Sequence, residues 1–222
     1  MKKPTIVIDR TDIPRRKMYL KKGSIFISLL FSLFVFATMA IAMQSPPPGH
    51  ELKVFKELLT NINAYFVFPE GFNEVKPIKN EKFPCQYALQ LPDNDFEIRF
   101  QVNQLKSEWR NYEQEKGDRT NPDSLYNKQA IAEAKSLAGT DGKYFARNIP
   151  PSVLQQYNAD LGKSYFLTLA DSPETNHYQY ALMVVLQKNH DGNIIVVCFG
   201  NERGPAFFKN INKLKDCLKF NN

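Results

Sequence analysis

The chain has 222 residues, of which 43% are hydrophobic, 13% aromatic and 23% charged, with 14 Pro and 10 Gly. These values are close to the globular average, so they exclude a wholly disordered chain, a collagen-like repeat and a membrane protein with many spans. The chain carries 29 Lys or Arg and 23 Asp or Glu; residues 1–22 hold 8 and 2 of these, which leaves 21 of each elsewhere. The excess positive charge belongs to residues 1–22, and the remaining chain has a net charge of zero. We therefore do not expect that remaining part to bind nucleic acid through its net charge.

An uncharged apolar segment follows the basic residues and covers residues 23–43. It is long enough to cross a hydrocarbon layer of ~30 Å. Since its basic flank is N-terminal, we expect residues 1–22 in the bacterial cytoplasm and everything after residue 43 exported. Two outcomes stay open: cleavage after Ala42, at an A-x-A site, would release a periplasmic protein, and retention would give a single-pass inner-membrane protein. The membrane is therefore a predicted partner through residues 23–43.

The first exported elements are a Pro-rich tether over residues 44–49 and an amphipathic helix over residues 50–62. A strand over residues 64–68 follows. Two alternating runs, Cys85–Leu91 and Phe96–Leu105, flank a turn and predict a β-hairpin. In the second run the aromatic and aliphatic residues share one face, and polar residues share the other, which is solvated or lies under a polar loop.

The chain between the hairpin and the next helix, residues 106–123, is charged and poor in aliphatic residues, so we expect a long connection there. A helix then begins at Asn121-Pro122, with Asn121 as the cap, and ends at Gly139.

Four strands and a helix are predicted in the last third. His190-Asp191-Gly192-Asn193 joins the last two strands as a hairpin turn, and the final run is apolar enough to be central in a sheet. The expected strands cover residues 143–148, 164–170, 178–187 and 193–199, and the helix covers residues 205–218. Residues 50–222 are therefore expected to form one α+β domain, a mostly antiparallel six- to seven-stranded sheet flanked by helices.

Catalytic chemistry has little support in the sequence. There is no Gly-x-Ser-x-Gly elbow and no Gly-rich phosphate loop, and no Cys or His pair has the spacing of zinc ligands. The three histidines, His50, His177 and His190, fall in the tether or near loops. We therefore expect no catalytic residue, no cofactor and no metal ligand.

The three cysteines are Cys85, Cys198 and Cys217. In an oxidising compartment a Cys198–Cys217 disulfide would join the last strand to the last helix and leave Cys85 unpaired. Buried free thiols are the alternative, because the cysteines lie in apolar runs.

Four residues are candidates for contact with a partner. Trp109 and Tyr112 are large aromatics within the charged connection, where they would either recognise a partner or fasten the connection to the sheet. Glu202 and Arg203 lie in the loop before the last helix, where they would contact a partner or simply belong to the turn that begins that helix.

A family resemblance rests on the segment from residue 150 onward. A short helix ending at Tyr157 leads into Asn158-Ala159-Asp160-Leu161-Gly162, followed by a strand and a Tyr-rich hairpin. Over residues 140–220 this resembles a group of uncharacterised exported proteins of Bacteroidetes-type bacteria. The element order is similar to the PsbP-like α/β/α sandwich of a photosystem accessory protein, a Ran-binding transport factor and several envelope proteins. The resemblance implies a non-catalytic binding or assembly role and transfers no site residue.

Three functions follow as hypotheses. The first is a non-enzymatic envelope protein that binds a protein partner or ligand through its sheet face or loops. The second is a structural subunit of a membrane complex, which requires residues 23–43 to be retained. The third is a hydrolase acting on envelope polymers, which requires His177 or His190 to meet a carboxylate within a cleft.

Overall fold

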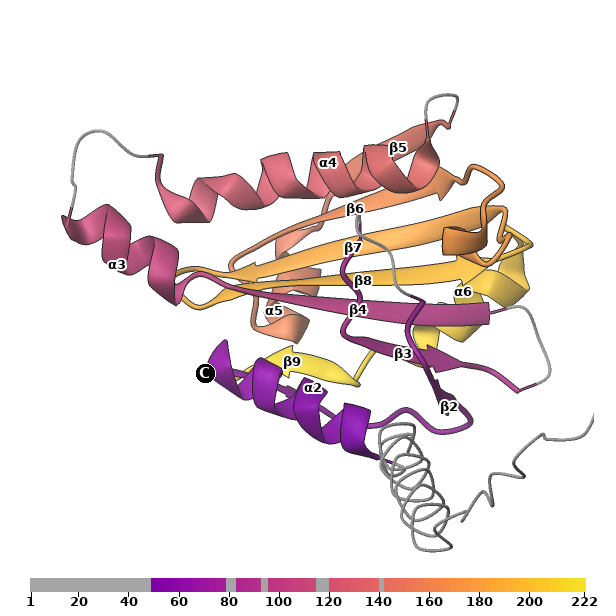
Figure 1. Cartoon of the computed structure of the whole chain (residues 1–222), viewed down its shortest axis with the longest axis horizontal. Coiled ribbons are helices and arrows are strands. Elements are labelled where there is room, and N and C mark those ends of the chain that lie inside the picture. Colours follow the sequence, from indigo (N-terminus) through magenta and orange to yellow (C-terminus); the bar gives the residue numbers. More distant parts are fainter. Residues whose placement is uncertain (1–48, 79–82, 93–95, 115–119, 140–141) are drawn as a thin grey trace, which may run out of the picture. The chain divides into compact units, whose positions relative to one another are not determined.

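A seven-stranded antiparallel sheet is the centre of the structure (Figure 1). The computed structural model describes residues 49–78, 83–92, 96–114, 120–139 and 142–222. The strand order is β2-β3-β4-β8-β7-β6-β5, and every neighbouring pair is antiparallel. The strands are β2 (Asn73–Val75), β3 (Tyr87–Gln90), β4 (Phe96–Gln104), β5 (Tyr144–Asn148), β6 (Leu161–Thr168), β7 (Tyr180–Lys188) and β8 (Gly192–Gly200). The expected α+β class and the antiparallel sheet are confirmed.

Both predicted hairpins are present. β3 pairs with β4, with Gln90 opposite Glu97, and β7 pairs with β8 across the turn that ends at Gly192. β8 lies between β4 and β7, and its side chains are almost all buried on both faces, as its continuous apolar sequence predicts. The short edge strand β2 has no alternating pattern and was not expected.

A second, two-stranded sheet joins segments from opposite ends of the described chain. β1 (Ala64–Phe66) pairs with β9 (Leu218–Phe220), with Ala64 opposite Phe220. The expected final helix is therefore too long: α6 (Pro205–Asn212) ends six residues before β9 begins, and Leu218 lies in the strand. Leu218 and Phe220 are buried in the core. The apolar residues that suggested one long helix therefore belong to two elements, α6 and β9.

The remaining helices are α2 (His50–Asn61), α3 (Lys106–Gln114), α4 (Leu125–Ala138) and α5 (Pro151–Tyr157), with 3-10 turns at Pro122–Ser124 and Pro173–Thr175. The helix predicted after Asn121 is present, but it begins as a 3-10 turn: the Asn121 side chain caps Pro122–Ser124 by accepting a hydrogen bond from the Asp123 N–H at 2.8 Å, and α4 follows from Leu125. The C-cap of α4 is Gly139, where φ is 71°. The expected connection over residues 106–123 is wrong in part, because its first half is α3.

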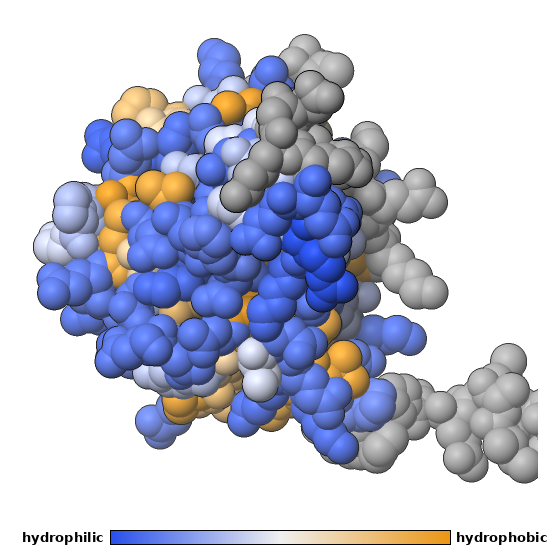
Figure 2. Space-filling view, turned by 90° about the vertical axis from the view of Figure 1, so that its left-hand side faces the viewer, coloured by the Kyte–Doolittle hydropathy of each residue, from blue (hydrophilic) through white to orange (hydrophobic). Residues whose placement is uncertain are grey.

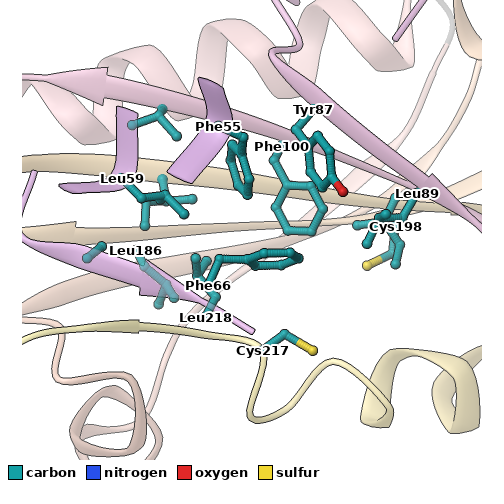
Figure 3. Close-up of a cluster of buried hydrophobic side chains, with 14 of the residues drawn as sticks. Phe55, Leu59, Phe66, Tyr87, Leu89, Phe100, Leu186, Cys198, Cys217 and Leu218 are labelled. Atoms are coloured by element: carbon teal, nitrogen blue, oxygen red, sulfur yellow. The ribbon is translucent and has the colours of Figure 1, made fainter. Parts of the chain in front are cut away.

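The helices cover both faces of the seven-stranded sheet. α4 packs on one face, over β6 and β7, while α2 and the β1–β9 pair lie on the other (Figure 1). The second face holds an aromatic core in which Phe55 of α2 stacks on Tyr87 with 4.7 Å between ring centroids, and Phe66 meets Phe100 edge-on at 5.5 Å (Figure 3). Each such pair adds about 1 kcal/mol beyond its buried area, so these rings fix α2 and β1 on the sheet.

Candidate functional site

Aromatic side chains gather where β5, β6 and β7 approach α6. Phe145 of β5 lies directly opposite Phe166 of β6. The Phe166 ring stacks with Tyr180 at 6.2 Å and with Phe208 of α6 at 6.5 Å between centroids. Phe145 is 58% exposed and Phe208 46% exposed. We call Phe145, Phe166, Tyr180 and Phe208 the aromatic surface.

Two arginines flank the aromatic surface, and each lies over one of its rings. The guanidinium carbon of Arg147 is 4.8 Å from the Phe145 ring centroid, and that of Arg203 is 5.6 Å from the Tyr180 centroid. Cation–π contact holds a guanidinium flat against a ring, so its N–H donors are aimed sideways, in its own plane. Planar donors beside exposed rings suit a partner that presents both carboxylates and apolar side chains.

The N-terminal turn of α6 explains why Phe208 is exposed. Pro205 occupies the first turn of α6, where a missing N–H costs nothing. Phe207 is buried and meets Phe96 edge-on at 5.6 Å. Successive helical residues point about 100° apart, so seating Phe207 in the core turns Phe208 outward.

Arg203 was expected as a contact residue, and the structure places it at the aromatic surface. Glu202 is exposed beside it in the same loop. Phe145, Phe166, Tyr180 and Phe208 were not expected as a group, because they come from four separate elements.

Trp109 and Tyr112 lie at the opposite end of β8, around the β7–β8 turn. The Trp109 indole donates a hydrogen bond to Asp123 Oδ1 at 3.0 Å and stacks on the His190 ring at 4.0 Å between centroids. Tyr112 meets Trp109 edge-on at 5.3 Å. These contacts agree with the fastening role that was the alternative to recognition. The structure therefore separates this pair from Glu202 and Arg203.

The surface on the α3 side of the molecule is mostly hydrophilic, and its apolar residues form small separate groups (Figure 2). A broad apolar interface has less support there than at the aromatic surface.

The polar side chains of β4 form a buried cluster on the face that α4 covers. Arg99 donates to Glu97 Oε1 at 2.6 Å, and these side chains are 0% and 5% exposed. Arg99 also donates to the Glu174 carbonyl, and its guanidinium lies 4.5 Å from the Phe199 centroid. The polar face of this strand thus lies partly under the loop that carries Glu174, one of the two arrangements expected from the sequence.

Glu133 of α4 faces the same cluster and is 8% exposed. Burial raises the pKa of its carboxyl to about 7, and a hydrogen bond with the Gln101 side chain opposes part of that increase. Glu133 Oε2 and Gln101 Oε1 have no hydrogen-bond partner among the described residues. A protonated Glu133 could donate to Gln101 Oε1, so the neutral carboxyl suits this position.

Two histidines lie near carboxylates. His177 Nδ1 is 2.5 Å from Asp171 Oδ1, but the two side chains are 63% and 85% exposed. His190 Nδ1 is 3.8 Å from Asp123 Oδ2, beyond hydrogen-bond reach. The His177 pair meets the distance that the hydrolase hypothesis requires, yet it lies open to water rather than in a cleft. His50 is exposed at the start of α2. No cluster of three or more His, Cys, Asp or Glu suited to a metal occurs in the described part of the chain.

All three cysteines are free thiols in the structure. Of the two alternatives left open by the sequence, the structure therefore has the buried thiols and not the Cys198–Cys217 disulfide. Cys198 and Cys217 belong to the same apolar cluster beneath the β1–β9 pair (Figure 3). Their burial raises the pKa of Cys198 to about 12 and that of Cys217 to about 11, which keeps both protonated.

The expected leader, membrane segment and cleavage position after Ala42, with most of the tether, lie outside the described residues. Among the helices that the structure describes, none combines the length and the hydropathy needed to cross a membrane.

No protein-family model matches this chain, and no curated protein matches it. Among solved structures it is similar to the solution structure of cyanobacterial PsbP (CyanoP) from Synechocystis sp. PCC 6803. The match has 13% sequence identity and a TM-score of 0.40, and it covers 73% of this chain and 89% of that one. A match of this size carries no argument about activity or partners, and the PsbP-like fold expected from the element order stays a prediction.

Proposed function

We propose that this protein is a non-catalytic binding protein of the bacterial envelope that holds a protein partner on the aromatic surface. The observation that carries the proposal is the exposure of Phe145 and Phe208 on the aromatic surface, where Arg203 lies over the Tyr180 ring. Exposed phenylalanines cost solubility unless they are covered, and aromatic residues with arginine are enriched at protein interfaces.

The partner is inferred from this chemistry. Its contact segment carries aliphatic or aromatic side chains that cover Phe208, together with Asp or Glu that pairs with Arg203. A carboxylate accepts two parallel hydrogen bonds from one guanidinium, which sets the orientation of the segment.

The envelope location is proposed from the sequence of residues 1–43. Retention of residues 23–43 would anchor the binding domain to the inner membrane, and cleavage after Ala42 would release it into the periplasm. N-terminal sequencing of the protein from its native envelope fraction decides between them. An intact leader would also favour the second candidate, a structural subunit of a membrane complex.

A site-specific photo-cross-linker tests the binding surface. The photoreactive group replaces Phe208 in the native host, and a matched control carries it at Phe68, which is 37% exposed and outside the aromatic surface. We expect a discrete adduct from position 208 and not from position 68, and loss of that adduct when Arg203→Glu is added. Equal cross-linking at both positions, no adduct, or an adduct that Arg203→Glu leaves unchanged would refute the proposal.

A further inference from the structure

Helix α4 packs on the sheet mainly through small side chains. Its buried residues are Ala130, Glu133, Ala134, Leu137 and Ala138. On the other face of the sheet, α2 buries Phe55 and Leu59 instead. The favourable free energy of burial grows with the apolar area that is covered, and an alanine methyl group covers little. We therefore expect α4 to be held on the sheet less firmly than α2.

Glu133 is the exception among these residues, because its carboxyl group is buried beneath α4. It is 8% exposed, and the Gln101 side chain of β4 forms a hydrogen bond with it. Glu133 Oε2 and Gln101 Oε1 both lack a hydrogen-bond partner among the described residues. A neutral carboxyl has a proton to give to an acceptor such as Gln101 Oε1, whereas an ionised carboxyl has none and carries a buried charge. The site therefore suits the protonated form of Glu133.

No cation in the described part of the chain forms an ion pair with Glu133. The guanidinium of Arg99, on β4, is bound to Glu97 at 2.6 Å. The ammonium of Lys163, on β6, donates a hydrogen bond to Asn127 at 2.8 Å. Both cations that the sheet brings near α4 are thus engaged elsewhere.

The other ionisable groups around α4 supply no positive charge to Glu133 either. Strands β7 and β8 have no ionisable residue on the face that α4 covers. Asp123, in the turn before α4, is an acid, and Lys128 and Lys135 of α4 itself are exposed to water. The remaining ionisable side chains beneath or beside α4 are phenols and one thiol: Cys85, Tyr126, Tyr144, Tyr165 and Tyr178. An ionised Glu133 would therefore be a buried charge without a counter-ion.

We infer that α4 is a lid on this face of the sheet, which stays closed while Glu133 is neutral and opens locally when Glu133 ionises. Lifting α4 brings the carboxylate into water, which removes the cost of the buried charge. The contacts that are lost are those of α4 with β6 and β7, in which alanines predominate. Opening uncovers Tyr165 of β6 and Met183 of β7, which are 1% and 0% exposed in the closed form.

The opening is expected to increase with pH. Burial raises the pKa of Glu133 to about 7 in the closed form, whereas the ordinary value of 4.5 applies in the open form. The closed form binds the proton more tightly, so its advantage is complete below about pH 4.5 and is lost as pH rises through 7. These two values predict that the equilibrium constant for opening rises about tenfold between pH 6 and pH 8.

This inference goes beyond the proposed function and does not depend on it. The aromatic surface lies on the other face of the sheet, where Phe166 packs against the cluster that contains Phe55 of α2. A lid that stays closed leaves the proposed partner contact at Phe208 unaffected, and the reverse also holds. The two proposals therefore fail separately.

Hydrogen–deuterium exchange of the full-length chain in detergent tests the lid. Protection factors are corrected for the pH dependence of the chemical exchange rate and are compared at pH 6 and pH 8. We expect α4 amides to be protected at least about tenfold less than β8 amides at pH 8, because local opening needs less free energy than global unfolding. Protection of α4 should also fall about tenfold from pH 6 to pH 8. Equal protection of α4 and β8 would overturn the inference, because exchange would then occur by global unfolding.

Two variants assign the pH response to Glu133. Glu133→Gln keeps the size of the side chain but cannot ionise, so the protection of α4 in this variant should not change with pH. Glu113→Gln, at an exposed position of α3, is the matched control and should retain the fall of about tenfold. A fall that persists in Glu133→Gln, or the absence of a fall in the unsubstituted chain, would also overturn the inference.

Exchange in low concentrations of urea measures the extent of the opening. Sensitivity to urea scales with the surface that an opening exposes. Because the lifting of α4 alone exposes little surface, the protection of α4 should decrease less steeply with urea than the protection of β8. The same slope for both elements would mean that the whole domain unfolds, which is incompatible with a lid.

Discussion

The indole of Trp109 and the carboxylate of Asp123 share a hydrogen bond of 3.0 Å, which ties α3 to the turn that begins α4. The same carboxylate oxygen accepts the His190 backbone N–H at 3.0 Å. One side chain therefore connects α3, the start of α4 and the β7–β8 turn, and Trp109 covers that connection from outside. This arrangement accounts for a tryptophan in an otherwise charged segment.

Trp109→Ala is expected to lower the free energy of unfolding by on the order of 2 kcal/mol, because it removes the stack on His190 and leaves Asp123 without its indole donor. Arg110→Ala, an exposed neighbour in α3, is the control and should change stability by less than about 0.5 kcal/mol. Urea unfolding measures both. An equally small effect of Trp109→Ala would show that the ring does not fasten α3.

Stability is expected to fall with rising pH because of Glu133. Its pKa is raised to about 7 in the folded chain against 4.5 for an ordinary Glu, so the folded state binds the proton more tightly. The favourable contribution is complete below about pH 4.5 and is lost as pH rises through 7. Glu133→Gln should therefore leave stability nearly unchanged at pH 4 and increase it at pH 8 by on the order of 2 kcal/mol.

Glu113→Gln, at an exposed position of α3, serves as the control for the loss of a charge. Thermal unfolding at pH 4, 6 and 8 compares the three proteins. A difference between Glu133→Gln and the unsubstituted chain that is the same at every pH would contradict this account.

Adjacent phenylalanines of α6 should respond differently to truncation. Phe207→Ala empties a buried site against Phe96 and is expected to cost about 3 kcal/mol or more. Phe208→Ala removes a ring that is 46% exposed and should cost less than about 1 kcal/mol. Chemical denaturation distinguishes them, and a large loss at Phe208 would mean that its ring serves the fold rather than a partner.

Buried thiols are expected to react slowly with maleimide in the folded chain. The pKa values of Cys198 and Cys217, about 12 and about 11, leave little thiolate at pH 8. In urea without reductant all three cysteines should be labelled, as shown by mass spectrometry. Labelling of Cys85 alone in urea would instead reveal a Cys198–Cys217 disulfide.

Local sequence patterns predicted most of the large sheet. Alternation in Phe96–Gln104, the Asp-Gly turn before β8 and the Asn121 cap are short-range signals, and each element is where its pattern indicates. Charged composition was misleading over Lys106–Gln114, because α3 is an exposed helix with no buried residue and so lacks an apolar stripe.

Long-range pairing was beyond the reach of these patterns. β9 has three residues and forms only because β1 lies beside it, and nothing near Leu218 in the chain indicates that neighbour. The burial of Arg99 likewise depends on Glu174, which is 75 positions away in the chain. Of the candidate site, only Arg203 was expected, because the rings around it are assembled by tertiary structure.

The β1–β9 pair also sets when the domain can be completed. Phe66 lies in the core together with Leu218 and Phe220, which follow it by more than 150 positions in the chain. Until they arrive, α2 and β1 lack one wall of their site on the sheet. Contacts between distant segments form late because loop closure must come first. α2 and β1 are therefore expected to complete their packing on the sheet late in folding.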